Sequence, residues 1–201
     1  MPPKPKFTRE QIIAVGLDLV RERGLEGLTA REVGARLGAS ARPIFTVFEN
    51  MEELTREVYA AAAKRIDAYA ERASVYNPPT KRAGMQMAMF AREEPKLFQL
   101  ILMRENKNVT TSDALFENLG PAAKEAIASM QAQYALNPDA ARMLFEQIWI
   151  FTYGVSALCA TGMCRFTDEE LSEMITREFS GILSQIRREN PSGGNENAAH
   201  H

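Results

Sequence analysis

The sequence has no histidine within the body of the chain, since its two histidines are the last residues, His200 and His201. It also has no G-x-S-x-G motif, no glycine-rich phosphate loop and no Glu-x-x-His metal motif. Adjacent carboxylates such as Glu93 and Glu94 are better explained as solvated charges or helix caps than as catalytic acids. These absences argue against an enzyme, and we expect no catalytic residues and no cofactor.

Cysteine is scarce as well, with only Cys159 and Cys164 in the chain. Their spacing fits neither a zinc site nor a redox pair, so we expect buried, reduced thiols and no metal site. The longest stretch without a charge, residues 147–164, contains enough polar residues to favour a core helix over a membrane span. The N-terminal Pro-Pro-Lys-Pro-Lys lacks the apolar core of a signal peptide, so we expect a cytoplasmic protein with no membrane partner.

Valine is rare beside alanine, at 8 residues against 28 among 201. Because alanine is the best helix former and β-branched residues prefer strands, the ratio predicts an all-α protein. A net charge of −2 excludes a uniformly basic nucleic-acid-binding protein. Residues 1–50 nevertheless hold eight Lys/Arg against six Asp/Glu, a net +2 that leaves −4 on the rest. A basic module on an acidic body is expected where only the module meets phosphates.

Three capping boxes mark helix starts, because in each a threonine hydroxyl can cap an amide and a Glu/Gln can reach back. The boxes pair Thr8 with Gln11, Thr29 with Glu32 and Thr167 with Glu170. They predict a helix that ends at Gly24 and a second, over about 29–37, that ends at Gly38. Ser40 is predicted to cap a third short helix that runs to about Phe48, with Pro43 in its first turn.

Asn50 and Glu53 are predicted to start a long helix that continues to about Val75. Beyond it we expect helices over about 80–93, 95–104, 112–135, 138–162 and 168–189, with Gly120-Pro121 kinking or splitting the third of these. The expected organisation is an N-terminal domain over residues 1–50, a helical domain over 51–189 and a disordered tail over 190–201.

Two short helices joined by a turn and preceded by a supporting helix form a helix-turn-helix, a unit that fits the DNA major groove. The outward positions of the third helix include Arg42, Phe45 and Thr46. Arg42 can donate two hydrogen bonds to guanine, and Thr46 can present its methyl group to thymine. The alternative is a packing unit of three helices that has no role in DNA binding.

The residues Leu28-Thr29, Arg31-Glu32-Val33, the segment 38–48 and Glu52-Glu53-Leu54 resemble the TetR family of transcriptional regulators. The resemblance implies a three-helix DNA-binding domain joined by a long helix to a helical domain for ligand binding and dimerisation. It also implies a homodimer that usually represses transcription from an operator in double-stranded DNA.

Carried over by position, the resemblance implies DNA contacts at Thr29, Arg31, Ser40, Arg42, Pro43, Phe45, Thr46 and Met51. Phe45 stands where the family usually has a tyrosine, and Met51 where it usually has a lysine. Each difference removes a donor to phosphate, so binding could depend more on Lys4, Lys6 and Arg9. These three charges could equally belong to a solvated tail.

The last two predicted helices carry apolar stripes suited to a two-fold four-helix interface, although part of each stripe must face the chain's own core. The expected dimer contacts are Phe151, Val155, Leu158, Phe179, Ile182 and Ile186. The resemblance also implies a pocket for a small-molecule effector, for which we expect Met89, Phe98, Met103, Phe116, Phe145, Trp149 and Tyr153. Ordinary core packing is the alternative for each of them.

The leading hypothesis is a ligand-responsive repressor that binds a pseudo-palindromic operator as a homodimer and is released by a small, largely apolar ligand. The alternative is a helical interaction or ligand-sensing protein of the same fold in which DNA binding is weakened or lost.

Overall fold

The computed structural model describes residues 6–107 and 109–189. Lys4, the expected tail over 190–201 and its two histidines lie outside these residues. The chain forms two compact units. Unit 1 consists of Met1–Arg72, Met89–Arg104 and Ser156–Arg165, and unit 2 consists of Ala73–Ala88, Glu105–Val155 and Phe166–His201. The domain boundary expected at residue 50 stays a prediction.

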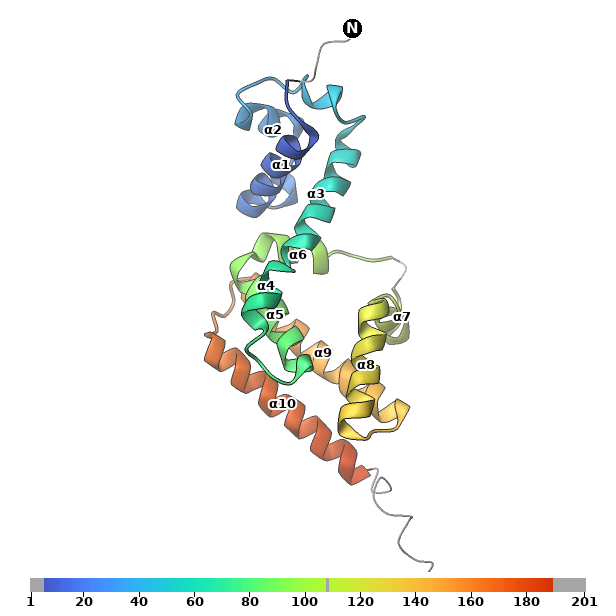
Figure 1. Ribbon diagram of the computed structural model, residues 1–201. Helices are drawn as coiled ribbons and strands as arrows, with labels where there is room; N and C mark the ends of the chain where they lie inside the picture. Colours follow the sequence, from blue (N-terminus) through green and yellow to red (C-terminus); the bar gives the residue numbers. More distant parts are fainter. Residues whose placement is uncertain (1–5, 108, 190–201) are drawn as a thin grey trace, which may run out of the picture. The chain divides into compact units, whose positions relative to one another are not determined.

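All regular structure in the described residues is helical, as the alanine content predicts (Figure 1). The α-helices are α1 Arg9–Arg23, α2 Ala30–Arg36, α3 Met51–Arg65, α4 Ala68–Ala73, α5 Pro79–Glu93, α6 Pro95–Leu102, α7 Ser112–Glu117, α8 Pro121–Tyr134, α9 Pro138–Ala160 and α10 Asp168–Glu189. Two short 3₁₀ helices are η1 Leu25–Gly27 and η2 Ile44–Thr46.

The predicted start and end of α1 are confirmed. The Thr8 hydroxyl accepts from the Gln11 amide at 3.2 Å, and the Gln11 side chain accepts from the Thr8 amide at 2.9 Å. Gly24 ends the helix with φ +75°, and its N–H donates to Val20 O at 2.8 Å. The capping box at Thr167 is likewise complete in both directions.

The box at Thr29 forms only in part. Its hydroxyl accepts from the Glu32 amide at 3.2 Å, as predicted for the start of α2. The Glu32 carboxylate does not reach back, because it pairs with Arg23 of α1 at 2.9 Å. This side chain therefore links α2 to α1 instead of closing the cap.

The third short helix predicted from Ser40 to about Phe48 is wrong as an α-helix, since the segment holds only η2. Pro43 has no N–H to donate. The Ile44 amide donates to Ala41 O and the Thr46 amide to Pro43 O, both three residues back, which closes 3₁₀ turns. The predicted Ser40 cap is wrong too, because Pro43 takes the N-cap position and no side chain caps η2.

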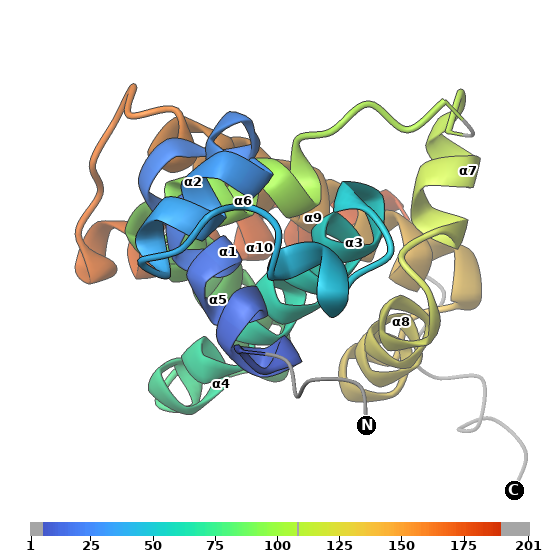
Figure 2. The same ribbon diagram turned by 90° about the horizontal axis from the view of Figure 1, so that it is seen from above.

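Unit 1 has an apolar core to which α1, α2, α3 and the η2 segment contribute. Its fully buried residues include Ile12, Val33, Ile44, Phe48 and Val58. α1 packs against α2, α3 and α6, and Figure 2 shows it alongside both α2 and α3. The core therefore holds η2 in place although that segment is not an α-helix.

Two predictions about helix continuity have opposite outcomes. The long helix predicted from Asn50 to Val75 is interrupted at residues 66–67 and forms α3 and α4. The predicted split at Gly120-Pro121 is confirmed, because Gly120 adopts φ +76° and Pro121 is the first residue of α8.

In unit 2, α9 and α10 begin and end within two residues of the predicted helices. Leu144 of α9 is fully buried, and so is Leu171 of α10. Among the described helices only α9 is long and apolar enough to cross a membrane. That is weak support for a span, because core helices of globular domains share this property.

Gly34 tests how tightly α2 packs against the segment that follows it. A Cβ added at Gly34 would lie 2.7 Å from both the carbonyl carbon and the oxygen of Ser40, which are backbone atoms. We expect Gly34→Ala to lower the free energy of unfolding by about 1–3 kcal/mol in urea denaturation, because the turn must shift.

The control is Gly181→Ala in α10, where nothing lies within 4 Å of the added Cβ. This change should raise stability by up to about 1 kcal/mol, because alanine favours the helix. An equal effect of the two substitutions would contradict close packing at Gly34.

Candidate nucleic-acid interface

The η2 segment has an inner and an outer face. Ile44 and Phe48 are buried in the core of unit 1, whereas Arg42 and Thr46 are exposed and Phe45 is 49% exposed. The buried pair anchors the segment and turns the other three side chains outward. These are the outward residues expected from the sequence, although a 3₁₀ turn presents them.

Most arginines of the N-terminal helices are already paired. Arg9 contacts Glu53 at 2.7 Å and Glu57 at 2.8 Å, and its guanidinium lies 4.4 Å from the centre of the Phe48 ring. The hydrogen bonds that Arg9 donates to Glu57 and Glu53 raise the pKa of Arg9. Arg9 is therefore paired with α3, and its role as an additional phosphate contact stays a prediction.

Arg31 of α2 and Arg42 before η2 differ from these arginines. Both are exposed, and neither has a carboxylate partner among the described residues. By contrast, Arg23 pairs with Glu32, and Arg36 forms two hydrogen bonds with Glu22 at 2.6 and 2.9 Å. Positive charge that is free to meet a phosphate is therefore found at two predicted DNA-contact positions.

The other predicted contact residues lie at the surface to different degrees. Thr29 and Ser40 are exposed, whereas Pro43 and Met51 are half-buried. The Thr46 hydroxyl donates to Pro43 O at 2.7 Å, so its oxygen is left as an acceptor and its methyl group remains available. Phe45 and Met51 offer apolar surface and no hydrogen-bond donor.

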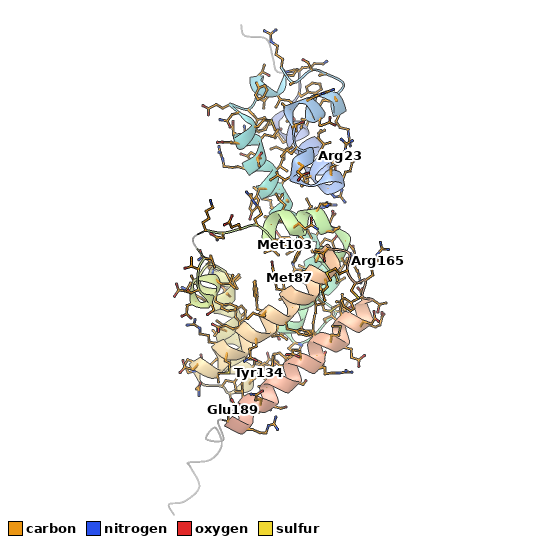
Figure 3. All side chains as sticks on the ribbon, turned by 180° about the vertical axis from the view of Figure 1, so that it is seen from behind. Arg23, Met87, Met103, Tyr134, Arg165 and Glu189 are labelled. Atoms are coloured by element: carbon orange, nitrogen blue, oxygen red, sulfur yellow. The ribbon has the colours of Figure 1, made fainter. Side chains whose placement is uncertain are left out.

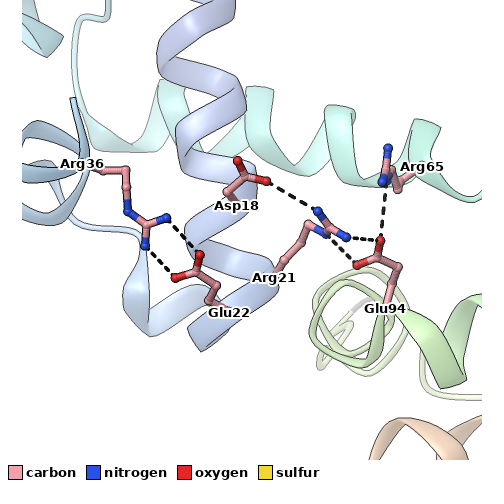
Figure 4. A network of polar contacts seen from close by, with 6 residues as sticks. All are labelled: Asp18, Arg21, Glu22, Arg36, Arg65 and Glu94. Atoms are coloured by element: carbon pink, nitrogen blue, oxygen red, sulfur yellow. Dashed lines mark hydrogen bonds and ion pairs between the residues drawn. The ribbon is translucent and has the colours of Figure 1, made fainter.

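A buried carboxylate connects α1 and α3 to α6 (Figure 4). Glu94, directly before α6, is only 7% exposed and accepts two hydrogen bonds of 2.7 Å from Arg21 of α1. Arg65 at the end of α3 lies 3.6 Å from the same carboxylate, and Asp18 lies 3.6 Å from Arg21. The pairing with Glu94 raises the pKa of Arg21.

Of the two interpretations of Glu94, the position next to a helix start is confirmed, whereas solvation is wrong. Glu94 occupies the N-cap position of α6, but its side chain caps nothing and turns into the ion pair instead. No local pattern predicts this contact, because Arg21 and Glu94 are 73 positions apart. Glu93 keeps more solvent contact and pairs with Arg72 of α4 at 2.7 Å.

The predicted effector-pocket residues divide between the two units. Met89 and Phe98 are buried in unit 1, and Met103 is exposed there. Three cavities in unit 1 are lined by other residues. In this unit, therefore, the expected pocket residues serve mainly as core.

In unit 2 the predicted aromatic residues come together. The Phe116 ring meets Phe145 and Trp149 edge to face at 6.2 and 5.7 Å between ring centres. The Trp149 and Tyr153 rings stack at 5.2 Å. Burial raises the pKa of Tyr153. The cluster forms one continuous aromatic surface, with Trp149 and Tyr153 half-buried.

Among the predicted dimer contacts, Val155, Ile182 and Ile186 are buried in the chain itself. Phe151 and Phe179 are half-buried, and Leu158 is exposed. Two further apolar residues of α9, Met143 and Ile150, are exposed. Met143 lies in the apolar stripe expected from the sequence, and helical spacing could have identified Ile150.

Residues 143, 147, 150 and 154 follow a spacing of four, three and four, which places them on one face of α9. The four residues are Met143, Gln147, Ile150 and Gly154, and all are exposed. We call this set the α9 stripe.

Comparison with known proteins is consistent with this arrangement. Residues 12–58, which run from α1 into α3, match the family described as bacterial regulatory proteins, tetR family. No curated protein matches the chain.

The chain is also similar to a solved protein from Vibrio parahaemolyticus described as a transcriptional regulator of the TetR family. The identity is 20% and the TM-score 0.52, with 86% of this chain and 97% of that one covered. A second similar structure is a transcriptional regulator (TerR/AcrR family) from Aquifex aeolicus VF5, at 22% identity, TM-score 0.49, and 92% and 98% coverage. At such identities the first likeness shows a shared fold.

The Arg21–Glu94 pair can be tested by removing the arginine. We expect Arg21→Ala to lower the free energy of unfolding by about 1–3 kcal/mol, because it leaves a buried carboxylate without its two short hydrogen bonds. Urea denaturation followed by circular dichroism measures the change. The control is Arg177→Ala in α10, whose partner Glu173 is also exposed; its effect should stay within about 0.5 kcal/mol. Equal losses in both variants would contradict the role of burial.

Proposed function

We propose that this chain, whose residues 12–58 match the tetR family of bacterial regulatory proteins, is a ligand-responsive repressor. In this proposal it binds a pseudo-palindromic operator in double-stranded DNA as a homodimer and acts in the cytoplasm. A small, largely apolar effector releases it. The match to the family and the all-helical fold support a DNA-binding transcriptional regulator.

The observation that carries the proposal is the distribution of free positive charge. Arg31 and Arg42 lack carboxylate partners in the described part of the chain, whereas Arg9, Arg21 and Arg36 are paired. A guanidinium that need not first leave an ion pair can bind phosphate, or the O6 and N7 atoms of guanine, at lower cost. Arg42 is the best candidate for reading a base.

The α9 stripe supports the homodimer. It sets the exposed side chains of Met143 and Ile150 on the same helical face as Gly154. An apolar face of this kind is typical of a protein interface, and a two-fold axis would bring the stripe against its own copy. Gly154 would let the two helices approach closely, since nothing lies within 4 Å of a Cβ built there.

The aromatic cluster of unit 2 supports an apolar effector. Trp149 and Tyr153 are half-buried and stacked, so an uncharged planar or aliphatic molecule could pack against the two rings. Release from DNA would follow if the effector binds more tightly to the dimer conformation that fits the operator poorly.

One observation favours a second function, that of a ligand-sensing or interaction protein with little affinity for DNA. The segment between α2 and α3 contains only the three-residue η2, and Phe45 and Met51 offer no donor to phosphate. A recognition segment with fewer phosphate contacts would bind DNA more weakly.

Arg42→Ala tests the proposed function directly. We expect it to weaken binding to DNA fragments flanking the protein's own gene by about 1–3 kcal/mol, because it removes a base contact and not only a charge. Fluorescence anisotropy at two salt concentrations, with a scrambled fragment for comparison, separates specific from non-specific binding.

Arg23→Ala is the matched control, because it removes the same charge from the same domain while Arg23 is paired with Glu32. Its effect should be much smaller. If the unchanged protein binds the flanking and scrambled fragments equally at low salt, the second function is favoured over the first.

Ile150→Lys tests the homodimer. Ile150 is 55% exposed at the middle of the α9 stripe, and a charge there would be buried at a two-fold interface. We expect the variant to shift from dimer to monomer in sedimentation velocity, with unchanged helical circular dichroism. Val75→Lys is the control, because Val75 is an apolar residue of the same unit, 75% exposed and outside the stripe. A dimer that persists in Ile150→Lys would locate the interface elsewhere.

A further inference from the structure

A cavity of about 470 Å³ lies within unit 1, between the start of α6 and the end of α9. Its lining includes Arg92 and Lys96 on one side and Cys159, Gly162 and Arg165 on the other. The volume lies in the range of about 300–1,000 Å³ that is typical of small-molecule sites. It contains none of the residues predicted for the apolar effector.

The lining of this cavity is strongly basic. Arg92, Lys96 and Arg165 contribute three cations, and no lining residue is acidic. Lys96 and Arg165 have no ion-pair partner in the described ranges 6–107 and 109–189. Arg92 is paired with Glu93 at 3.3 Å, so the charge available to a ligand is that of Lys96 and Arg165.

The two walls of the cavity are joined by a side chain of the lining. Gln99 Nε2 of α6 donates to Ala160 O, the last carbonyl of α9, at 2.7 Å. After α9 the chain turns at Gly162, whose φ of +72° suits glycine and whose N–H donates to Cys159 O at 3.0 Å. This turn leads to Arg165, which is labelled in Figure 3. Lys96 and Arg165 are therefore carried by two segments that are tied together.

We propose that this cavity binds a small organic or inorganic anion that carries at least two carboxylate or phosphate charges. Lys96 and Arg165 line the cavity without an ion-pair partner in the described residues, and no lining residue is a carboxylate, so their two positive charges are left to be neutralised. Guanidinium groups match the geometry of carboxylate and phosphate oxygens, and the lysine adds a mobile donor. The anion is chemically unlike the apolar effector proposed for unit 2, so the two proposals can fail independently.

The competing explanation is structural. The carbonyl end of α9 carries partial negative charge, and nearby cations stabilise a helix C-terminus. In that case Lys96 and Arg165 would contribute to stability without any ligand. The experiment must therefore separate ligand binding from a loss of stability.

The probes are citrate, for carboxylates, and pyrophosphate, for phosphates. Isothermal titration calorimetry on the full chain, against sodium chloride at equal ionic strength, should give saturable binding of at least one probe. Lys96→Gln and Arg165→Gln should each weaken that binding about tenfold, because each removes one charge-assisted contact. Lys124→Gln, an exposed cation of α8 outside the cavity, should leave it unchanged.

The melting temperature without a probe is measured on the same variants. Saturable binding that is lost in the two cavity variants and kept in Lys124→Gln supports the site. Absence of saturable binding of both probes, or equal binding by all variants, overturns it. Should Lys96→Gln fail to fold, Arg165→Gln on the surface turn decides the outcome.

Discussion

The buried carboxylate of Glu94 is the contact on which the arrangement of unit 1 depends most. Burying a charge is costly, and the cost is offset here by two short hydrogen bonds from Arg21 and by Arg65 nearby. These three residues belong to α1, the start of α6 and the end of α3. A single carboxylate thus connects α1 with α3 and α6.

Pairing with carboxylates also determines which arginine side chains of the N-terminal helices remain available to a ligand. In a chain with a net charge of −2, most N-terminal arginines are neutralised by carboxylates of the same unit. Arg31 and Arg42 are left without such partners in the described residues, and both are exposed. The positions of arginines without a carboxylate partner are therefore a better guide to a possible phosphate-binding surface than the total charge of the chain.

The apolar core fixes which side chains of the η2 segment face outward, although the segment is not an α-helix. Ile44 and Phe48 are buried, so Arg42 and Phe45 must face outward whether or not the segment is α-helical. The outward residues could therefore be predicted from apolar spacing alone. The helix could not, because the absence of an N–H on Pro43 and the 3₁₀ bonds around it decide the backbone.

Local patterns in the sequence determined most of the helices. Capping at Thr8 and Thr167, the stop at Gly24 and the split at Gly120-Pro121 depend on interactions that reach four residues or fewer. The aromatic cluster of unit 2 was also foreseeable in part, because Phe145, Trp149 and Tyr153 recur every four residues along one helix.

Only the tertiary structure decided the burial of Glu94, the pairing of Arg9 with α3 and the placement of Lys96 and Arg165 around one cavity. Each depends on residues separated by at least 44 positions, as Arg9 is from Glu53. Helix periodicity shows which side of a helix is apolar, but it does not show which helix packs there or which charges that helix brings. Electrostatic partners are therefore settled only when the helices pack.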